Sequence, residues 1–168
     1  MIPEAKRLAE KSHQGQFRKF ENTSFVQHPI QVARILKSAA EEVTKEMVAA
    51  ALLHDTVEDT GVTHEQIRSR FGARVAKLVK ELFTTDKEKR DEYGKSKYLG
   101  WKMANMSDSA LTIKLCDRYH NVRKIEETPK KFRKRYSKET RKTILILLRR
   151  KTLTFAQRRI VKQILQKV

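Results

Sequence analysis

Cysteine, proline and glycine are scarce in this sequence of 168 residues, which has one, three and five of them. Because Cys116 is the only cysteine, the chain cannot form an internal disulfide, and a reducing compartment is expected. Long apolar runs are lacking too: none approaches the ~20 residues needed to cross a bilayer, and the N-terminus has no signal-peptide core. We therefore expect a cytoplasmic protein without a transmembrane segment.

While helix breakers are few, alanine, leucine, lysine, arginine and glutamate are abundant, as in all-α proteins. The length is sufficient for one domain with a substantial core. We therefore predict an all-α fold. Its principal domain is expected over residues 1–150, with a basic amphipathic helix over residues 151–168 docked on the same domain.

Positive charge is concentrated at the C-terminal end. The net charge is +18, yet residues 1–129 hold 23 basic and 19 acidic side chains, whereas residues 130–168 hold 15 basic side chains and one acid, Glu139. Such a region attracts anions such as nucleotides, RNA or acidic lipid. The alternatives are a solvated helix surface without a dedicated partner, and contact with a second copy of the chain in a homodimer.

Apolar spacing and capping residues predict most of the helices. Their expected starts or ranges are residues 3–13, His28-Pro29 with His28 as N-cap, Thr44, Thr63, Ser107, Ser137, and Phe155 to Val168. The helix after Thr44 is apolar on all sides, which predicts a buried central position. Gly72 predicts an interruption of its helix, and the polar residues 84–97 predict a mobile connection or a frayed helix.

The central helix ends in a run of polar groups, His54-Asp55 followed by Glu58 and Asp59. Burying such groups destabilises a fold unless they bind something. Histidine and aspartate are ligands of divalent first-row metal ions. The run therefore predicts half of a metal site, with its other ligands elsewhere in the chain.

Two further candidate ligands are present. His28 lies at a helix start, where a polar cap is the alternative role, and Asp117 lies in an apolar helix, where a salt bridge would also serve. With His54 and Asp55 they would make a mixed N/O shell that suits Mn²⁺, Fe²⁺ or Zn²⁺ and leaves room for water. The carboxylates three and four residues after Asp55 would then be free to orient that water or move its proton.

The loop over residues 14–27 carries Arg18-Lys19, adjacent cations that suit phosphate oxygens. By composition alone they could equally be two of many surface cations.

The order of these motifs resembles the HD-domain phosphohydrolases and, within them, the hydrolase domain of RelA/SpoT-type proteins. The matching segments, over about residues 3–127, are Arg18-Lys19, His28-Pro29 with the apolar positions up to Leu36, Ala50 to Thr60, Phe71-Gly72 with Val75, and Lys114 to Asn121. The length leaves no room for the synthetase domain of the long enzymes. The resemblance therefore implies a stand-alone small alarmone hydrolase, similar to the metazoan SpoT homologues.

The resemblance also implies a site and a reaction. The fold would be an HD-domain helical bundle with one Mn²⁺ at its centre, held by His28, His54, Asp55 and Asp117. The reaction would remove the 3′-pyrophosphate from guanosine tetra- or pentaphosphate, (p)ppGpp, the alarmone of the stringent response, giving GDP or GTP and pyrophosphate. Glu58 and Asp59 would activate the water. The side chains implied to bind the substrate are Arg18, Lys19, Lys114 and Asn121.

Two alternatives stay open. The family usually has a small or turn-forming segment after Arg-Lys and a Pro-Tyr before His-Pro, whereas this chain has Phe20-Glu21-Asn22 and Ser24-Phe25. The substrate could therefore be another nucleotide such as NADPH, on which related animal enzymes act. In the second alternative, the chain is a nucleotide- or RNA-binding module whose HD site is vestigial.

Overall fold

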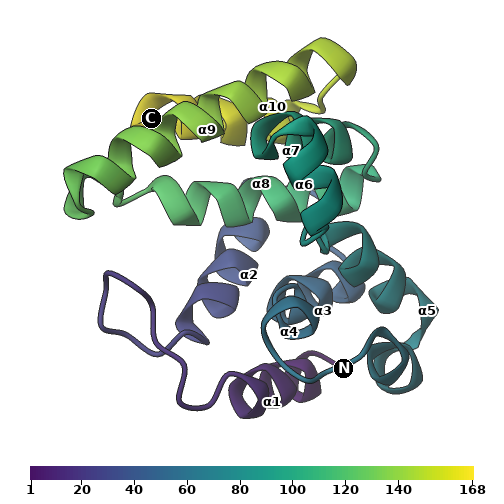
Figure 1. Ribbon diagram of the computed structural model, residues 1–168. Coiled ribbons are helices and arrows are strands. Elements are labelled where there is room, and N and C mark those ends of the chain that lie inside the picture. Colours follow the sequence, from purple (N-terminus) through teal and green to yellow (C-terminus); the bar gives the residue numbers. More distant parts are fainter. The chain divides into compact units, whose positions relative to one another are not determined.

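The computed structural model describes residues 1–168, which form α-helices, one short 3₁₀ turn and an isolated β-bridge, and the all-α prediction is confirmed. The chain divides into two compact units, Met1–Phe83 and Thr84–Val168 (Figure 1). None of the helices combines the length and the apolar character that a membrane crossing requires. The domain boundary expected at residue 150 and the cytoplasmic location stay predictions.

The first unit, here called the N-terminal unit, contains α1 (Ile2–Ser12), α2 (Gln27–Ala39), α3 (Lys45–Leu53), α4 (Thr56–Asp59) and α5 (His64–Leu82). Within it, α3 contacts α1, α2 and α5 (Figure 1). Every residue of α3 from Met47 to Leu53 is buried. Thr44 caps the helix by accepting a hydrogen bond from Met47 N at 3.2 Å. The predicted buried central helix is confirmed, and its C-terminal end is fixed inside the unit.

The start of α2 differs from the prediction. The helix begins at Gln27 with Val26 as N-cap, so His28 lies inside the first turn and is only 2% exposed. Pro29 allows this register because the first N–H groups of a helix have no acceptor within it. The prediction that His28 caps the helix is therefore wrong, and its imidazole points into the unit instead.

Both predictions for α5 are confirmed. The Thr63 hydroxyl accepts a hydrogen bond from Gln66 N, and the Gln66 side chain accepts one from Thr63 N, which completes a capping box. Gly72 has a φ of +87° and interrupts the helix. This left-handed conformation favours glycine because it has no Cβ.

The second, C-terminal unit contains α6 (Lys87–Tyr93), α7 (Lys95–Ala104), α8 (Asp108–Val122), a 3₁₀ turn (Ile125–Glu127), α9 (Lys130–Arg150) and α10 (Phe155–Lys167). Within it, α7 packs on α9 and α10 packs on α8 (Figure 1). A Cβ built on Gly100 of α7 would lie 2.7 Å from Ile146 Cβ and 3.0 Å from the Thr143 carbonyl oxygen, both on α9. The approach of these two helices therefore depends on a glycine.

Two helices of this unit extend beyond the predictions. The polar segment after residue 84 is ordered as α6, which Asp86 caps by accepting a hydrogen bond from Lys89 N at 3.1 Å. The prediction that Ser137 starts a helix is wrong, because α9 begins after Pro129 and runs through Ser137. The lysines and arginines before Ser137 have good helix propensity, and a serine inside a helix costs only a few tenths of a kcal/mol, about 0.5 relative to alanine.

The contact of α10 with α8 is made by a buried amide as well as by apolar side chains. Gln157 is fully buried, and its Nε2 donates to the Asp108 carbonyl oxygen at 3.1 Å and to Thr112 Oγ1 at 3.2 Å. Ile160 and Ile164 are buried on the same helix. The cations of α10 are exposed on the remaining surface, so the helix is amphipathic.

Candidate metal centre

The joint between α3 and α4 presents two adjacent polar side chains. His54 is the C-cap of α3, and Asp55 is the N-cap of α4. Thr56 Oγ1 donates to the Leu53 carbonyl oxygen at 2.7 Å, and Asp59 N donates to the Asp55 carbonyl oxygen at 2.9 Å. These bonds hold the joint, so both side chains have defined directions.

Three predicted metal ligands lie together in the N-terminal unit. His54 Nε2 is 3.1 Å from Asp55 Oδ2, and His28 Nε2 is 3.5 Å from the same oxygen. The two imidazole rings are 5.2 Å apart at their centroids. One donor atom from each residue lies within 4.8 Å of the others. The structure therefore brings together two nitrogens and one carboxylate from α2 and the α3–α4 joint.

The protonation of His54 indicates why a cation fits between these groups. Its Nδ1 lies 2.8 Å from the Ala51 carbonyl oxygen, which has no proton to give, so Nδ1 must be the donor. In the neutral imidazole the lone pair is then on Nε2, which faces Asp55 Oδ2. Two such electron-rich atoms need a proton or a metal ion between them. Fixing the tautomer through a backbone carbonyl is also the usual outer-shell arrangement of a ligating histidine.

The two carboxylates assigned to the water lie on α4, next to this cluster. The pKa of Asp59 is raised above its usual range, first by partial burial and then by the negative charges of Asp55 and Glu58. His13 and His54 act in the opposite direction. A carboxylate with a raised pKa is a better proton acceptor near neutral pH, so Asp59 has the electrostatics of a general base.

Two residues near Asp59 escaped the sequence analysis. His13 is 1% exposed, and its Nδ1 lies 2.8 Å from Gln16 Oε1. Gln16 Nε2 in turn donates to the Asp59 carbonyl oxygen at 3.1 Å, and the His13 ring lies 4.7 Å from Phe25. These two hydrogen bonds, from His13 to Gln16 and from Gln16 to Asp59, hold the end of α4. The sequence did contain a signal for this pair, because a histidine and an amide lie three residues apart at the end of an amphipathic helix.

The loop cations Arg18 and Lys19 are engaged within their own loop. Arg18 Nη2 lies 3.2 Å from Glu21 Oε1, and Lys19 Nζ lies 5.5 Å from the centroid of the Phe20 ring. A bridge between Phe17 and Ser24 closes the loop. Glu21 is therefore the partner of a predicted phosphate-binding cation.

The other predicted site residues lie together on α8, in the C-terminal unit. Asp117 is buried, with Lys114 Nζ 2.9 Å from its Oδ2 and Asn121 Nδ2 donating to its Oδ1 at 2.6 Å. Their neighbour Cys116 is fully buried, and burial raises the pKa of its thiol to about 12, so it is a packing group.

Comparison with known proteins identifies relatives along most of the chain. The HD-domain family matches residues 5–150. The guanosine-3′,5′-bis(diphosphate) 3′-pyrophosphohydrolase MESH1 of Danio rerio is 38% identical over 115 residues, covering 68% of this chain and 63% of the relative. The guanosine-3′,5′-bis(diphosphate) 3′-pyrophosphohydrolase of Haemophilus influenzae is 38% identical over 137 residues, covering 79% of this chain and 20% of the relative. The solved structure of a metazoan SpoT orthologue, described as hydrolysing ppGpp, is 29% identical, with a TM-score of 0.79 over 96% of this chain and 94% of that chain.

These similarities agree with the chemistry of the cluster. The chain spans a fifth of the Haemophilus influenzae relative and just under two thirds of the Danio rerio one. The HD-domain match covers all three clustered residues, and their donor set implies a divalent metal ion. The chain belongs to the HD-domain family and, within it, to the group of the metazoan SpoT homologues.

Proposed function

We propose that this chain is a Mn²⁺-dependent hydrolase that removes the 3′-pyrophosphate from (p)ppGpp, giving GDP or GTP and pyrophosphate. The observation that carries the proposal is the cluster of His28, His54 and Asp55, whose donor atoms lie within 4.8 Å of one another. Relatives named as guanosine-3′,5′-bis(diphosphate) 3′-pyrophosphohydrolases cover most of the chain and support the substrate class.

In the proposed site Asp117 is the fourth ligand, beside His28, His54 and Asp55. Two imidazoles and two carboxylates form a mixed shell that suits Mn²⁺ and leaves coordination positions for water and substrate. A bound divalent ion supplies Lewis acidity and lowers the pKa of a water molecule. Lys114 and Asn121 orient the Asp117 carboxylate by binding one oxygen each.

The carboxylates of α4 have the proton-transfer role. Asp59 accepts a proton from the attacking water, and Glu58 orients that water. The water oxygen bonds to the phosphorus attached to the 3′ oxygen, and the bond from this phosphorus to the 3′ oxygen breaks. The 3′ oxygen takes up a proton, so the products are pyrophosphate and a nucleotide with a free 3′ hydroxyl.

Cations would hold the substrate. Arg18 and Lys19 bind the 3′-pyrophosphate, and Lys114 and Asn121 contribute to the nucleotide side. Because Arg18 Nη2 is 3.2 Å from Glu21 Oε1, this carboxylate competes with the substrate for the guanidinium. The chain therefore carries an internal competitor for one of its proposed substrate contacts.

A direct assay tests the proposal. Purified protein incubated with Mn²⁺ and ppGpp is expected to release GDP and pyrophosphate in equal amounts, and chelation of the metal is expected to stop the release. NADPH and other nucleotides in the same assay give the order of kcat/KM values. A metal-loaded protein that leaves ppGpp intact would overturn the proposal, and faster turnover of NADPH would replace the substrate.

A further inference from the structure

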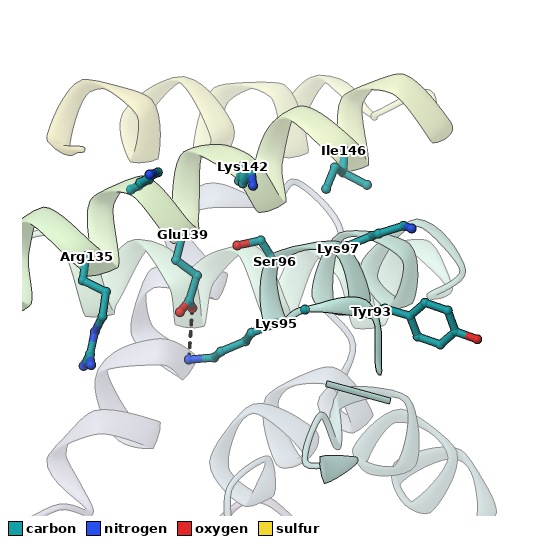
Figure 2. A pocket seen from close by; sticks show the side chains of 10 residues that line it. Tyr93, Lys95, Ser96, Lys97, Arg135, Glu139, Lys142 and Ile146 are labelled. Carbon is teal, nitrogen blue, oxygen red and sulfur yellow. Dashed lines mark ion pairs between the residues drawn. The ribbon is translucent and has the colours of Figure 1, made fainter. Parts of the chain in front are cut away.

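A basic cavity lies in the C-terminal unit, beside the start of α7 and one side of α9. Its volume is about 450 Å³. It is lined by five cations, one acid and four other residues: Lys95, Lys97, Arg135, Lys138, Lys142, Glu139, Tyr93, Gly94, Ser96 and Ile146 (Figure 2). None of these residues belongs to the candidate metal centre. The cavity therefore requires an explanation of its own.

The positive charge of this cavity is only partly balanced. Glu139 Oε1 lies 3.1 Å from Lys95 Nζ (Figure 2) and 3.7 Å from Arg118 Nη1, so two cations already share the only acid of the lining. The ion pairs of this unit include neither Lys138 nor Lys142. Cations gathered in this way repel one another unless an anion joins them. The cavity thus has an excess of positive charge and exposed ammonium groups to offer.

The start of α7 adds backbone donors to the same cavity. Gly94, with a φ of +78°, is the N-cap and provides no side-chain oxygen to the helix. The N–H groups of Lys97 and Tyr98 return to the Gly94 carbonyl oxygen at 3.1 and 3.0 Å. The N–H groups of Lys95 and Ser96 precede them in the first turn, where no intrahelical acceptor exists. They supplement the side-chain cations with a partial positive charge.

We propose that this cavity binds a phosphate chain of two or more groups, either as free inorganic polyphosphate or as the phosphate arm of a nucleotide. Cations spread around the lining match an anion that carries several charges better than a single phosphate. The volume is that of a small-molecule site. The proposal does not rest on the proposed hydrolase activity, because it concerns different residues and predicts binding rather than turnover.

The cavity carries its own optical probe. Trp101 is the only tryptophan of the chain, and Lys97 Nζ lies 4.6 Å from its ring centroid. Tyr93, whose ring is 5.3 Å from that of Trp101, also lines the cavity and is 39% exposed. A phosphate chain that attracts Lys97 is expected to draw this ammonium from the indole face. The fluorescence of Trp101 should change as a result.

The test is a titration of the metal-loaded protein with phosphate, pyrophosphate and tripolyphosphate at constant ionic strength. Trp101 fluorescence and calorimetry report the same binding, and calorimetry does not depend on the indole. Affinity is expected to increase along this series. Lys138→Gln combined with Lys142→Gln should weaken tripolyphosphate binding at least about tenfold, because two charge-assisted contacts are lost.

The matched control is Lys162→Gln combined with Lys167→Gln on α10. Both lysines are exposed and neither lines the cavity, so the net charge changes equally while the cavity is unaltered. This pair is expected to change the affinity less than about twofold, since distant exposed charges are screened. Equal weakening by both pairs would overturn the proposal in favour of general charge attraction. Binding unaffected by either pair would place the phosphate elsewhere and also overturn it.

A last comparison identifies the source of the phosphate chain. If GTP binds more tightly than tripolyphosphate and Tyr93→Leu removes the difference, a nucleotide is the ligand and Tyr93 contacts its base. If the two bind alike, inorganic polyphosphate fits the cavity equally well. Binding of single-stranded RNA in the absence of any binding of these small phosphates would overturn the proposal.

Discussion

The two units of the chain differ in charge far more than in secondary structure. The N-terminal unit has 13 basic and 11 acidic side chains and holds four of the five histidines, whereas the C-terminal unit has 25 basic and nine acidic side chains. In the first unit, several cations have acidic partners: Lys6 with Glu10, Arg18 with Glu21, and Arg70 with Glu4. The second unit also forms ion pairs, such as Lys95 with Glu139, but its nine acids are too few to pair with all 25 cations. One unit has groups suited to proton and metal chemistry, and the other has an excess of charge that attracts anions.

The units also bury different kinds of polar group. His13, His28 and His54 are buried in the N-terminal unit, and a histidine can be buried in its neutral form. The C-terminal unit buries a single histidine, His120, together with the charged side chains of Asp117 and Arg118. Arg118 stays charged, and it lies 5.2 Å from the Tyr136 ring centroid. Buried permanent charges need such partners, whereas a buried neutral imidazole keeps a lone pair for a metal.

The largest expected effect follows removal of a histidine from the cluster. His54→Ala should abolish metal binding and lower kcat/KM for ppGpp by a factor on the order of 10³ or more, because metal-assisted activation of water is lost. Elemental analysis gives the metal content per chain, and the ppGpp assay gives the rate. Loss of both metal and turnover in this variant would show that ppGpp hydrolysis depends on the histidine cluster of the N-terminal unit.

His64→Ala is the matched control, since His64 lies on α5 of the same unit and outside the cluster. It is expected to retain both metal and activity. A His54→Ala protein that keeps its metal would show that the cluster is not the metal centre. The division of roles between the units would then have to be abandoned.

A smaller loss is expected for Asp59→Asn, which should retain the metal and lower kcat on the order of 10²-fold. Only the ionised carboxylate accepts a proton, so wild-type kcat/KM should rise with pH through the raised pKa of Asp59. The variant should lose this acidic limb of the pH profile. An unchanged limb would assign the base to another residue.

The same variant has a predictable effect on stability. Because the folded pKa of Asp59 is raised, the folded state holds this proton more tightly, and its contribution to stability is lost as pH rises through that pKa. Asp59→Asn should therefore raise the Tm of the metal-free protein at neutral pH. The gain should be below about 0.5 kcal/mol, since the side chain is only partly buried and water screens its charge. Thermal unfolding at two pH values tests the sign.

The sequence predicts local features well and spatial partners poorly. Thr44 and Thr63 could be identified as caps because each hydroxyl accepts a hydrogen bond from an N–H group only three residues further along the sequence. His54-Asp55 could be identified because two polar groups end an apolar helix. The link from His13 through Gln16 to Asp59 spans more than 40 residues, and no local pattern fixes such a distance. The register of α2 depends on packing in the same way, so His28 could be selected as a ligand but not placed correctly.

The C-terminal unit gives a further example. Its excess of cations is evident from composition. The cavity beside α7 and α9, however, depends on the residue at which α7 starts. The residues before α7 are polar and show no helical spacing of apolar side chains, so the sequence does not predict that start. Gly100 likewise resembles any glycine in a helix until the position of Ile146 is known. Charge excess can therefore be predicted, whereas the surface that concentrates it follows from helix packing.

An intermediate effect, on stability rather than chemistry, is expected for Gly100→Ala. The new Cβ would lie 2.7 Å from Ile146 Cβ, so α7 and α9 must move apart. Overpacking costs about 1–3 kcal/mol, and the better helix propensity of alanine offsets up to about 1 kcal/mol. The Tm should fall by about 5 °C. Gly61→Ala, where nothing lies within 4 Å, is the control and should leave the Tm nearly unchanged.

Relief of the clash tests this explanation. Ile146→Ala should reduce the cost of Gly100→Ala, so the two substitutions together should destabilise less than the sum of their separate effects. Additive losses would show that the glycine is not required by Ile146. Metal content should remain at the wild-type level throughout, because neither Gly100 nor Ile146 belongs to the proposed ligand set.

The smallest effect is expected at the ion pair of the N-terminal unit's loop. Glu21→Gln removes the negative charge 3.2 Å from Arg18 and so lowers the number of acid–cation pairs in this unit. The KM for ppGpp should fall about threefold with kcat unchanged, since an exposed ion pair contributes less than about 1 kcal/mol. Glu41→Gln, an exposed acid outside the loop, controls for net charge. If KM rises instead, Glu21 positions Arg18 for the substrate, and pairing in this unit assists binding rather than competing with it.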